Sequence, residues 1–254
     1  MTIEDGFSDR GGTVDIGRVI GRTFAVIARN PGLFLIFALL LGGIPSVLPN
    51  AGPVLGDWLA SIRPGVTIYL LGAAAWLIFL LGSALLQAVL VKVAVSGLGG
   101  GRVTPSEALG GGLSLILPLI GLTVVTALGI GLGVMLLIVP GIMLACAWSV
   151  AVPALVEERG GVFEAMGRSR ALTRGSRWYV LALFAIYWVA SLMLGSVSGM
   201  MTFGSIALPI VLIVDMVTGT ITSMVGAAGI AALYVELRTV REGASFDALA
   251  DIFD

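Results

Sequence analysis

An arginine-rich stretch between two long apolar runs constrains the fold more than any other feature of this sequence. The stretch runs from Glu157 to Trp178 and contains five arginines, namely Arg159, Arg168, Arg170, Arg174 and Arg177. Placing this much charge in the hydrocarbon core of a bilayer costs too much free energy. We therefore expect the stretch to lie at the membrane surface and the flanking apolar runs to cross the membrane.

The composition is typical of a polytopic membrane protein. Of the 254 residues, 58% are hydrophobic and 11% are charged, whereas about a quarter of a soluble domain is charged. The chain contains no histidine, which removes the commonest general base and metal ligand. Its single cysteine, Cys146, has no second cysteine with which to form a disulfide or a metal site. The sequence predicts no catalytic centre, metal site or cofactor.

Six apolar runs are predicted to cross the membrane. They cover about residues 31–48, 66–95, 113–139, 141–156, 178–198 and 206–235. The stretch 113–156 is too long for one crossing, because a bilayer core needs about 20 residues, so we interpret it as a hairpin that turns at Pro140-Gly141. The fold class is therefore all-α, a polytopic membrane helical bundle. The predicted parts are a polar tail at 1–13, a membrane domain at 14–235 and an acidic cytoplasmic tail at 236–254.

The basic residues fall almost entirely on one side of this topology. Thirteen of the fourteen lie in the N-terminal segment, in the second and fourth connections, or in the C-terminal tail. Only Arg63 lies on the other side. Because basic loops are retained in the cytoplasm, both termini are expected to be cytoplasmic.

Three short segments are predicted to be cytoplasmic surface helices, each followed by a transmembrane hairpin. They cover about residues 14–30, 104–112 and 161–175. In the first, the apolar arc contains Ile16, Val19, Ile20, Thr23, Phe24, Val26 and Ile27. Arg18, Arg22 and Arg29 lie opposite this arc, as in an amphipathic helix at a membrane surface. Because Gly21-Arg22-Thr23 aligns with Gly167-Arg168-Ser169, we interpret the chain as three helix-plus-hairpin pseudo-repeats.

Two neighbouring motifs resemble a known bacterial family. The first reads Pro153-Ala154-Leu155-Val156, followed by Glu158. The matching positions of the second are Ala165, Arg168, Ser169, Leu172, Thr173, Gly175 and Trp178. With the Pro-Gly turn before them, these residues resemble the membrane domain attached to some glycerophosphoryl diester phosphodiesterases, and related uncharacterised six-span proteins.

The resemblance implies a protein of the bacterial inner membrane with a role near lipid metabolism. The phosphodiesterase of such proteins is a separate soluble barrel domain, which this sequence does not show. We therefore expect no enzymatic activity. The leading hypothesis is a lipid-interacting protein, or one that acts in envelope homeostasis. The alternative is a small-solute or lipid transporter, for which a hydrated cavity at the membrane midplane would be evidence. A groove open to lipid would favour lipid handling.

Five arginines are the candidate residues for binding anionic lipid or another anion. They are Arg22, Arg168, Arg170, Arg174 and Arg177. A guanidinium group pairs bidentately with phosphate, which makes anionic lipid headgroups the natural partners. Two alternatives stay open: the stretch serves only to orient the chain, or it forms a pocket for a specific phosphate-bearing ligand. No nucleic-acid partner is expected.

Three glutamates in the same stretch are predicted to form a structural clasp. Glu164 lies four residues before Arg168, a spacing that allows an ion pair along one helix. Glu157 and Glu158 are expected to pair with Arg174 or Arg177. These pairs would order the surface segment and take no part in catalysis.

Asp215 and the acidic tail each allow more than one interpretation. Asp215 lies inside an apolar run, where an acid is a candidate functional residue. It also precedes Glu236 by about 30 Å of helix at ~1.5 Å per residue, which favours a carboxylate near the outer interface. The tail has an apolar stripe that includes Phe246 and Leu249. It is expected to dock on the arginine-bearing segments or to recruit a soluble partner, unless it stays solvated.

Three pairs of small residues are spaced for close helix contact in lipid. They are Gly129 with Gly133, Gly195 with Gly199, and Gly219 with Ser223. We expect all three to mediate packing within the bundle.

Overall fold

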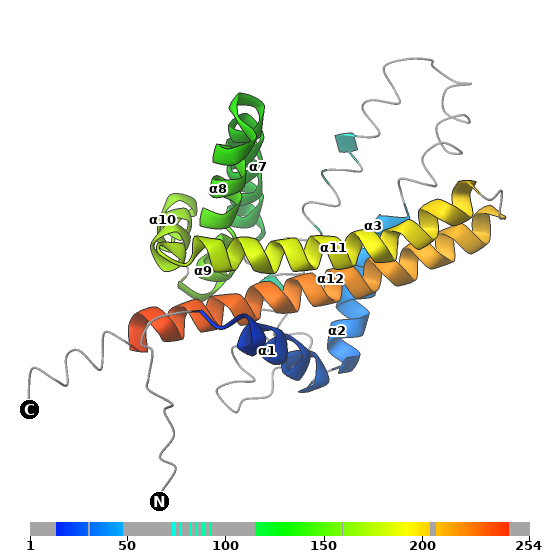
Figure 1. Cartoon of the computed structure of the whole chain (residues 1–254), viewed down its shortest axis with the longest axis horizontal. Coiled ribbons are helices and arrows are strands. Elements are labelled where there is room, and N and C mark those ends of the chain that lie inside the picture. The colour runs from blue at the N-terminus through cyan, green and yellow to red at the C-terminus, as the bar shows by residue number, and fades with distance from the viewer. Residues whose placement is uncertain are drawn as a thin grey trace, which may run out of the picture.

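The structure is a computed structural model that describes residues 14–29, 31–47, 115–158, 160–203 and 207–243, with isolated positions between 73 and 92. Every regular element in these residues is a helix, and helices make up 91% of them (Figure 1). The predicted all-α class is therefore confirmed. The predicted span at 66–95, the surface helix at 104–112 and the tail at 1–13 lie largely or wholly outside the described residues, as do residues 244–254 of the predicted tail at 236–254.

The N-terminal part is a bent succession of helices. It comprises α1 (Ile16–Arg29), α2 (Pro31–Ala38), the π-helix η1 (Leu39–Gly43) and α3 (Ile44–Ser46). The axes of α1 and α2 differ by 96°, at a point where Pro31 removes a backbone donor from the helical ladder. The predicted surface helix and first span are thus two separate elements.

The predicted central hairpin is present, but its turn lies earlier than expected. α7 (Ile116–Leu136) and α8 (Ile138–Ala147) are separated by the extended residue Leu137. Pro140 and Gly141 fall in the first turn of α8, where a proline is tolerated because its missing N–H would have no helical partner. Gly141 packs on Val134, since a Cβ at Gly141 would lie 2.6 Å from the Val134 nitrogen. The Pro-Gly pair therefore brings the helices together instead of forming the turn.

The remaining helices are α9 (Ala151–Glu158), α10 (Val162–Thr173), α11 (Arg177–Phe203), α12 (Leu208–Arg238) and the π-helix η2 (Thr239–Gly243). Figure 1 shows α11 and α12 as one long antiparallel hairpin, with α1 against the C-terminal half of α12. The α7–α8 hairpin extends away from this pair, and α9 and α10 lie at its base (Figure 1). The two hairpins diverge and do not form one bundle of parallel helices.

Four described helical segments are long and apolar enough to cross a membrane. They are Leu117–Leu136, Ile138–Glu158, Arg177–Met201 and Leu208–Gly243, with a fifth if α1 and α2 together count as one bent span. The chain is therefore a multi-pass membrane protein. The predicted number of six spans exceeds the four or five candidates in the described part of the chain, and it stays a prediction.

The core lies at the end of the α11–α12 hairpin where α12 finishes. Its largest cluster contains Leu155 from α9, Leu172 from α10, and Tyr234 and Leu237 from α12, all fully buried. A smaller cluster packs Phe34 and Phe37 of α2 on two alanines of α12, Ala227 and Ala228. Alanines on this part of α12 leave room for its neighbours, so several helices converge here.

Two of the three small-residue pairs mediate close packing. A Cβ at Gly129 would lie 2.6 Å from the Trp148 ring, so that glycine brings α7 against the residues that follow α8. Gly219 and Ser223 of α12 contact Ser46 and Gly42 respectively, which closes η1 and α3 onto α12. No described residue lies within 4 Å of a Cβ built at Gly195 or Gly199, so packing at this pair stays a prediction.

Candidate functional site

A buried carboxylate anchors α1 to α12. The side chain of Glu236 is 0% exposed. Its Oε2 lies 2.7 Å from Nη1 of Arg22, and its Oε1 lies 3.4 Å from Nε of Arg18. The contacts are charge pairs without an aligned hydrogen bond. Asp15 adds a further charge, 3.7 Å from Arg18, so Arg22 and Arg18 are neutralised within the protein.

A second charge network joins α9, α10 and the end of α12. Nε of Arg168 donates to Oε1 of Glu158 at 2.6 Å, and the same guanidinium donates to Glu242. Glu242 also accepts from Nε of Arg238 at 2.7 Å. The hydrogen bond to Glu158, and then that to Glu242, raise the pKa of Arg168 above its ordinary value against the opposing effect of burial. Arg168 is therefore a permanent cation with two carboxylate partners.

Of the three glutamates of the predicted clasp, only Glu158 forms an ion pair among the described residues, and its partner is not one that was predicted. Glu158 pairs with Arg168, and neither Arg174 nor Arg177 pairs with a glutamate in the described part of the chain. Glu164 does not pair with Arg168. It accepts the Gly161 N–H at 2.9 Å, because a carboxylate in the first turn satisfies a free donor and suits the helix dipole. Glu157 has no ion pair to a described residue.

The buried face of α10 explains why its other arginines point outward. Ala165, Met166, Ser169, Leu172 and Thr173 are buried and form one face of the helix. Ser169 fixes this face by donating to the Ala147 carbonyl at 2.8 Å. The opposite face is left to solvent or to the membrane surface.

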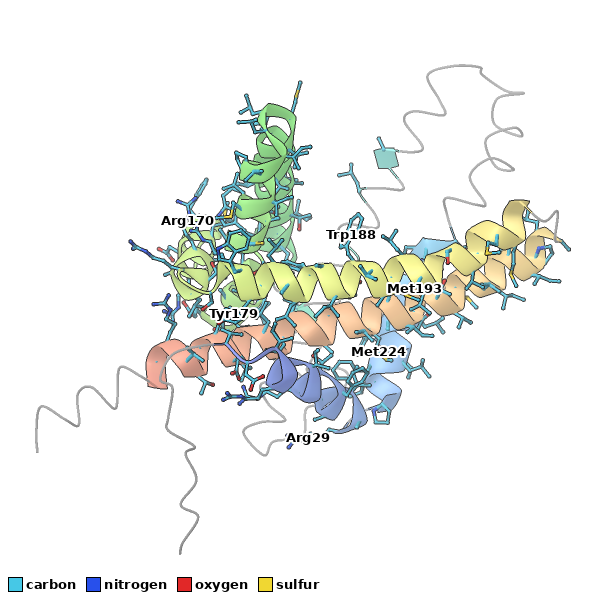
Figure 2. The ribbon with its side chains drawn as sticks, in the orientation of Figure 1. Arg29, Arg170, Tyr179, Trp188, Met193 and Met224 are labelled. Carbon is cyan, nitrogen blue, oxygen red and sulfur yellow. The ribbon has the colours of Figure 1, made fainter. Side chains whose placement is uncertain are left out.

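Arg170 and Arg174 are two open cations of this region. Both are exposed, and neither lies within ion-pair distance of a carboxylate among the described residues. Two large aromatic side chains of the same region, Phe163 and Trp178, are each 76% exposed. In Figure 2, Arg170 projects from the α10 end of the molecule, where α11 begins. Exposed arginines beside exposed aromatic rings are typical of a surface that meets lipid headgroups.

A glycine turn brings further charge to the same place. Gly175 has a φ of 87°, a conformation that other residues rarely adopt, and it lets the chain reverse from α10 into α11. A Cβ at Gly175 would lie 3.3 Å from Nη2 of Arg241. Nε of Arg177 is buried and has no hydrogen-bond partner in the described residues. Of the five predicted arginines, Arg170, Arg174 and Arg177 thus gather at this turn, whereas Arg22 and Arg168 are held by glutamates.

An apolar groove lies between α1, α11 and α12. Its volume is about 400 Å³, and it opens on one side. α12 supplies its floor from Ser223 to Leu233, and α11 supplies one wall from Val180 to Ala190. Side chains of α1, including Phe24, form the other wall.

Asp215 is buried near the start of α12. It is 8% exposed and accepts a hydrogen bond from Ser198 of α11. Ser46 of α3 donates to its backbone carbonyl at 2.8 Å. Asp215 thus joins three helices. The described residues contain no cluster of three side chains suited to bind a metal ion.

The sequence analysis missed Glu236 and Glu242 as site residues, because both were assigned to the tail. One signal was available for Glu236: it follows an alanine-rich apolar run directly, and Arg18 and Arg22 are spaced by one helical turn. An isolated acid at the end of a span needs such a partner. For Glu242, the spacing of four residues after Arg238 was a signal for an ion pair along one helix, whereas its second partner, Arg168, lies far away in the sequence.

No family model matches the chain, and no solved structure matches it. A UPF0259 membrane protein of Pectobacterium carotovorum is 36% identical to it over 77 residues. That match covers 30% of this chain and 31% of the relative, so it spans less than a third of the relative's length. The chain is thus similar to a bacterial membrane protein. The comparisons do not support the predicted association with glycerophosphoryl diester phosphodiesterases.

Proposed function

We propose that this protein is a non-enzymatic component of the bacterial inner membrane that binds anionic lipid headgroups through Arg170 and Arg174. The observation that carries the proposal is the contrast among its arginines. Arg22 and Arg168 have glutamate partners, whereas Arg170 and Arg174 are exposed without one in the described part of the chain. The exposed ring of Trp178 follows four residues after Arg174 in the sequence.

The physical chemistry favours a phosphate-bearing partner. Arginine binds phosphate through two parallel N–H groups, and an arginine near an anionic leaflet contributes about 1 kcal/mol. Tryptophan is enriched at the membrane interface, at the depth of the headgroups. Both features together favour a bilayer surface over a soluble anion.

The proposed topology has six spans with both termini in the cytoplasm. The distribution of basic residues supports it, as does the position of α1 and α10, each directly before a predicted hairpin. The acidic tail then lies on the same side as the arginines. We propose membrane lipid as the main partner. The same topology would also let a soluble cytoplasmic partner bind the acidic tail.

The alternative function is transport of a small solute or lipid. One observation favours it: the π-helix η1 interrupts the first span beside α12, and such irregular helices often mark functional sites. The nearest buried acid, Asp215, already accepts a hydrogen bond from Ser198. The groove beside α11 is apolar and open on one side, which supports lipid handling over passage of a polar solute.

Lipid retention by the full-length protein tests the proposal. The double variant Arg170→Gln/Arg174→Gln is purified in mild detergent, and phosphatidylglycerol per protein is measured by mass spectrometry. We expect a loss of roughly thirtyfold, since two arginines contribute about 1 kcal/mol each. Arg170→Lys/Arg174→Lys is the matched control and should retain most of the lipid. Unchanged retention in the glutamine variant would show that the stretch serves only to orient the chain.

A further inference from the structure

We propose that the groove between α1, α11 and α12 holds one acyl chain of a phospholipid from the cytoplasmic leaflet. The proposal rests on the proposed function. It adds a contact with the acyl chain to the headgroup contact already proposed for an anionic phospholipid. The headgroup lies at the charged end of the α11–α12 hairpin, and the chain runs along α12 from there.

The length of the groove matches one leaflet. Its floor on α12 runs from Ser223 to Leu233 and its wall on α11 from Val180 to Ala190. At ~1.5 Å per residue, each stretch is about 15 Å long, which is half of the ~30 Å hydrocarbon core. Both stretches lie within candidate membrane spans. A ligand of this length and depth is an acyl chain of a single leaflet.

The hydroxyl groups of the lining are largely satisfied by the protein itself. The Tyr187 hydroxyl donates to the Thr222 carbonyl at 3.1 Å. The Thr23 hydroxyl donates to the Val19 carbonyl at 2.8 Å. The rest of the surface is mainly hydrocarbon, contributed by residues such as Phe184 and Ile230. A polar solute would lose hydrogen bonds to water here without gaining others, so the chemistry selects a hydrocarbon chain.

Charge marks one end of the groove. Leu233 lies one turn before Glu236, but Arg18 and Arg22 are already neutralised there by Glu236 and Asp15. On α11, Val180 lies three residues after Arg177, whose Nε is buried without a hydrogen-bond partner in the described residues. The described lining itself carries no charged residue at either end, and the only ionisable side chain in it, Tyr187, lies toward the opposite end, at Ala190 and Ser223. This difference in charge between the two ends of the groove sets the orientation of the lipid. Its phosphate lies at the end near Arg177.

A photoactivatable lipid tests the proposal on the full-length protein. The probe is phosphatidylglycerol with a diazirine in the middle of one acyl chain, in vesicles of phosphatidylethanolamine and phosphatidylglycerol. Cross-linked residues are identified by peptide mass spectrometry. We expect labelling concentrated on the groove residues of α11 and α12, above that of Trp188 and Leu192, which are exposed on α11 outside the groove.

A matched pair of variants separates the groove from the surrounding lipid. Ala190→Trp places a large ring at the inner end of the groove, and Ala185→Trp places the same ring at an exposed site of α11 outside it. We expect Ala190→Trp to lower groove labelling by roughly fivefold, the factor that ~1 kcal/mol produces. Ala185→Trp should leave it unchanged. Gly229→Leu is a second filling variant, because a Cβ there meets only the Thr23 hydroxyl at 3.9 Å.

Each outcome bears on one proposal. Equal labelling of groove and outer residues, or no response to Ala190→Trp and Gly229→Leu, would overturn the acyl-chain site. A groove without label, covered instead by another part of the chain, would overturn it too. If the groove is labelled as expected but Arg170→Gln/Arg174→Gln retains its phosphatidylglycerol, the headgroup proposal fails and the groove stands. The reverse pattern would leave only the headgroup site.

Discussion

The two long hairpins of this protein have similar composition and very different surroundings. The α7–α8 hairpin contains no charged residue, and it contacts the other described helices mainly through its base at α9 and α10. Its far end is bare: Met135 is 86% exposed. The α11–α12 hairpin carries α1 along its side, a groove between them, and two charge networks at its end.

The comparison shows that hydropathy determines which segments span the membrane, whereas charge determines which helices pack against them. Hydropathy identifies both hairpins as membrane spans. The positions of the carboxylates decide which hairpin packs against further helices. This is because a carboxylate at the end of a span needs a cation supplied by another helix. Glu236 forms ion pairs with α1, and Glu242 forms an ion pair with α10. The α7–α8 hairpin has no such group and relies on glycine contacts.

Removing the buried carboxylate should have the largest effect. Glu236→Ala leaves Arg18 and Arg22 without their shared partner, and the free energy of unfolding should fall by about 3–5 kcal/mol. Thermal unfolding in detergent measures this. Asp15→Asn, at an exposed pair, is the control and should cost less than about 1 kcal/mol. A loss for Glu236→Ala no larger than that of the control would show that charge does not hold α1 in place.

Glycine contacts in the two hairpins provide the next largest difference. Gly141→Ala places a Cβ against the Val134 backbone of α7 and should destabilise the α7–α8 hairpin by roughly 1–3 kcal/mol. Gly195→Ala in α11 meets no described residue and should be neutral or slightly stabilising, since alanine favours a helix. Hydrogen exchange measured peptide by peptide in both variants distinguishes these two outcomes. Equal exchange in both variants would contradict the packing assigned to α7 and α8.

The network at Arg168 should have the smallest effect on stability. Arg168→Gln removes contacts to Glu158 and Glu242, which are partly exposed, so we expect a loss of about 1 kcal/mol. Arg170→Gln should leave the unfolding transition unchanged, because Arg170 is exposed and unpaired within the described residues. If Arg170→Gln destabilised the protein as much, Arg170 would have a structural partner and its assignment to lipid would be wrong.

Much of the fold was predictable from the sequence, because helical spans depend on local hydropathy and surface helices on local periodicity. The boundaries of α11 and α12 lie close to the predicted spans, and α10 lies within the predicted surface helix at 161–175. The turn of the α7–α8 hairpin was misplaced, because Pro140 and Gly141 also suit the start of a helix. Its divergence from α11–α12 has no local signal.

The candidate site was predictable only in part. The arginines of α10 were identified from charge alone, but their partners were not. Ion pairs between distant segments, such as Arg22 with Glu236, depend on how α1 lies on α12, which no spacing along the chain encodes. The groove likewise arises from three helices that meet only in the folded protein.

The most direct test of the central claim is a labelling experiment with a membrane-impermeant maleimide. The claim is that the charged end of α10 faces the cytoplasm and that the α7–α8 hairpin crosses the membrane away from it. In a Cys146→Ser background, single cysteines replace Ala171 on α10 and Met135 at the hairpin end. The account predicts that Ala171→Cys reacts in inverted vesicles and not in intact cells, and that Met135→Cys does not react in inverted vesicles. Reaction of Ala171→Cys in intact cells, or of Met135→Cys in inverted vesicles, would contradict it.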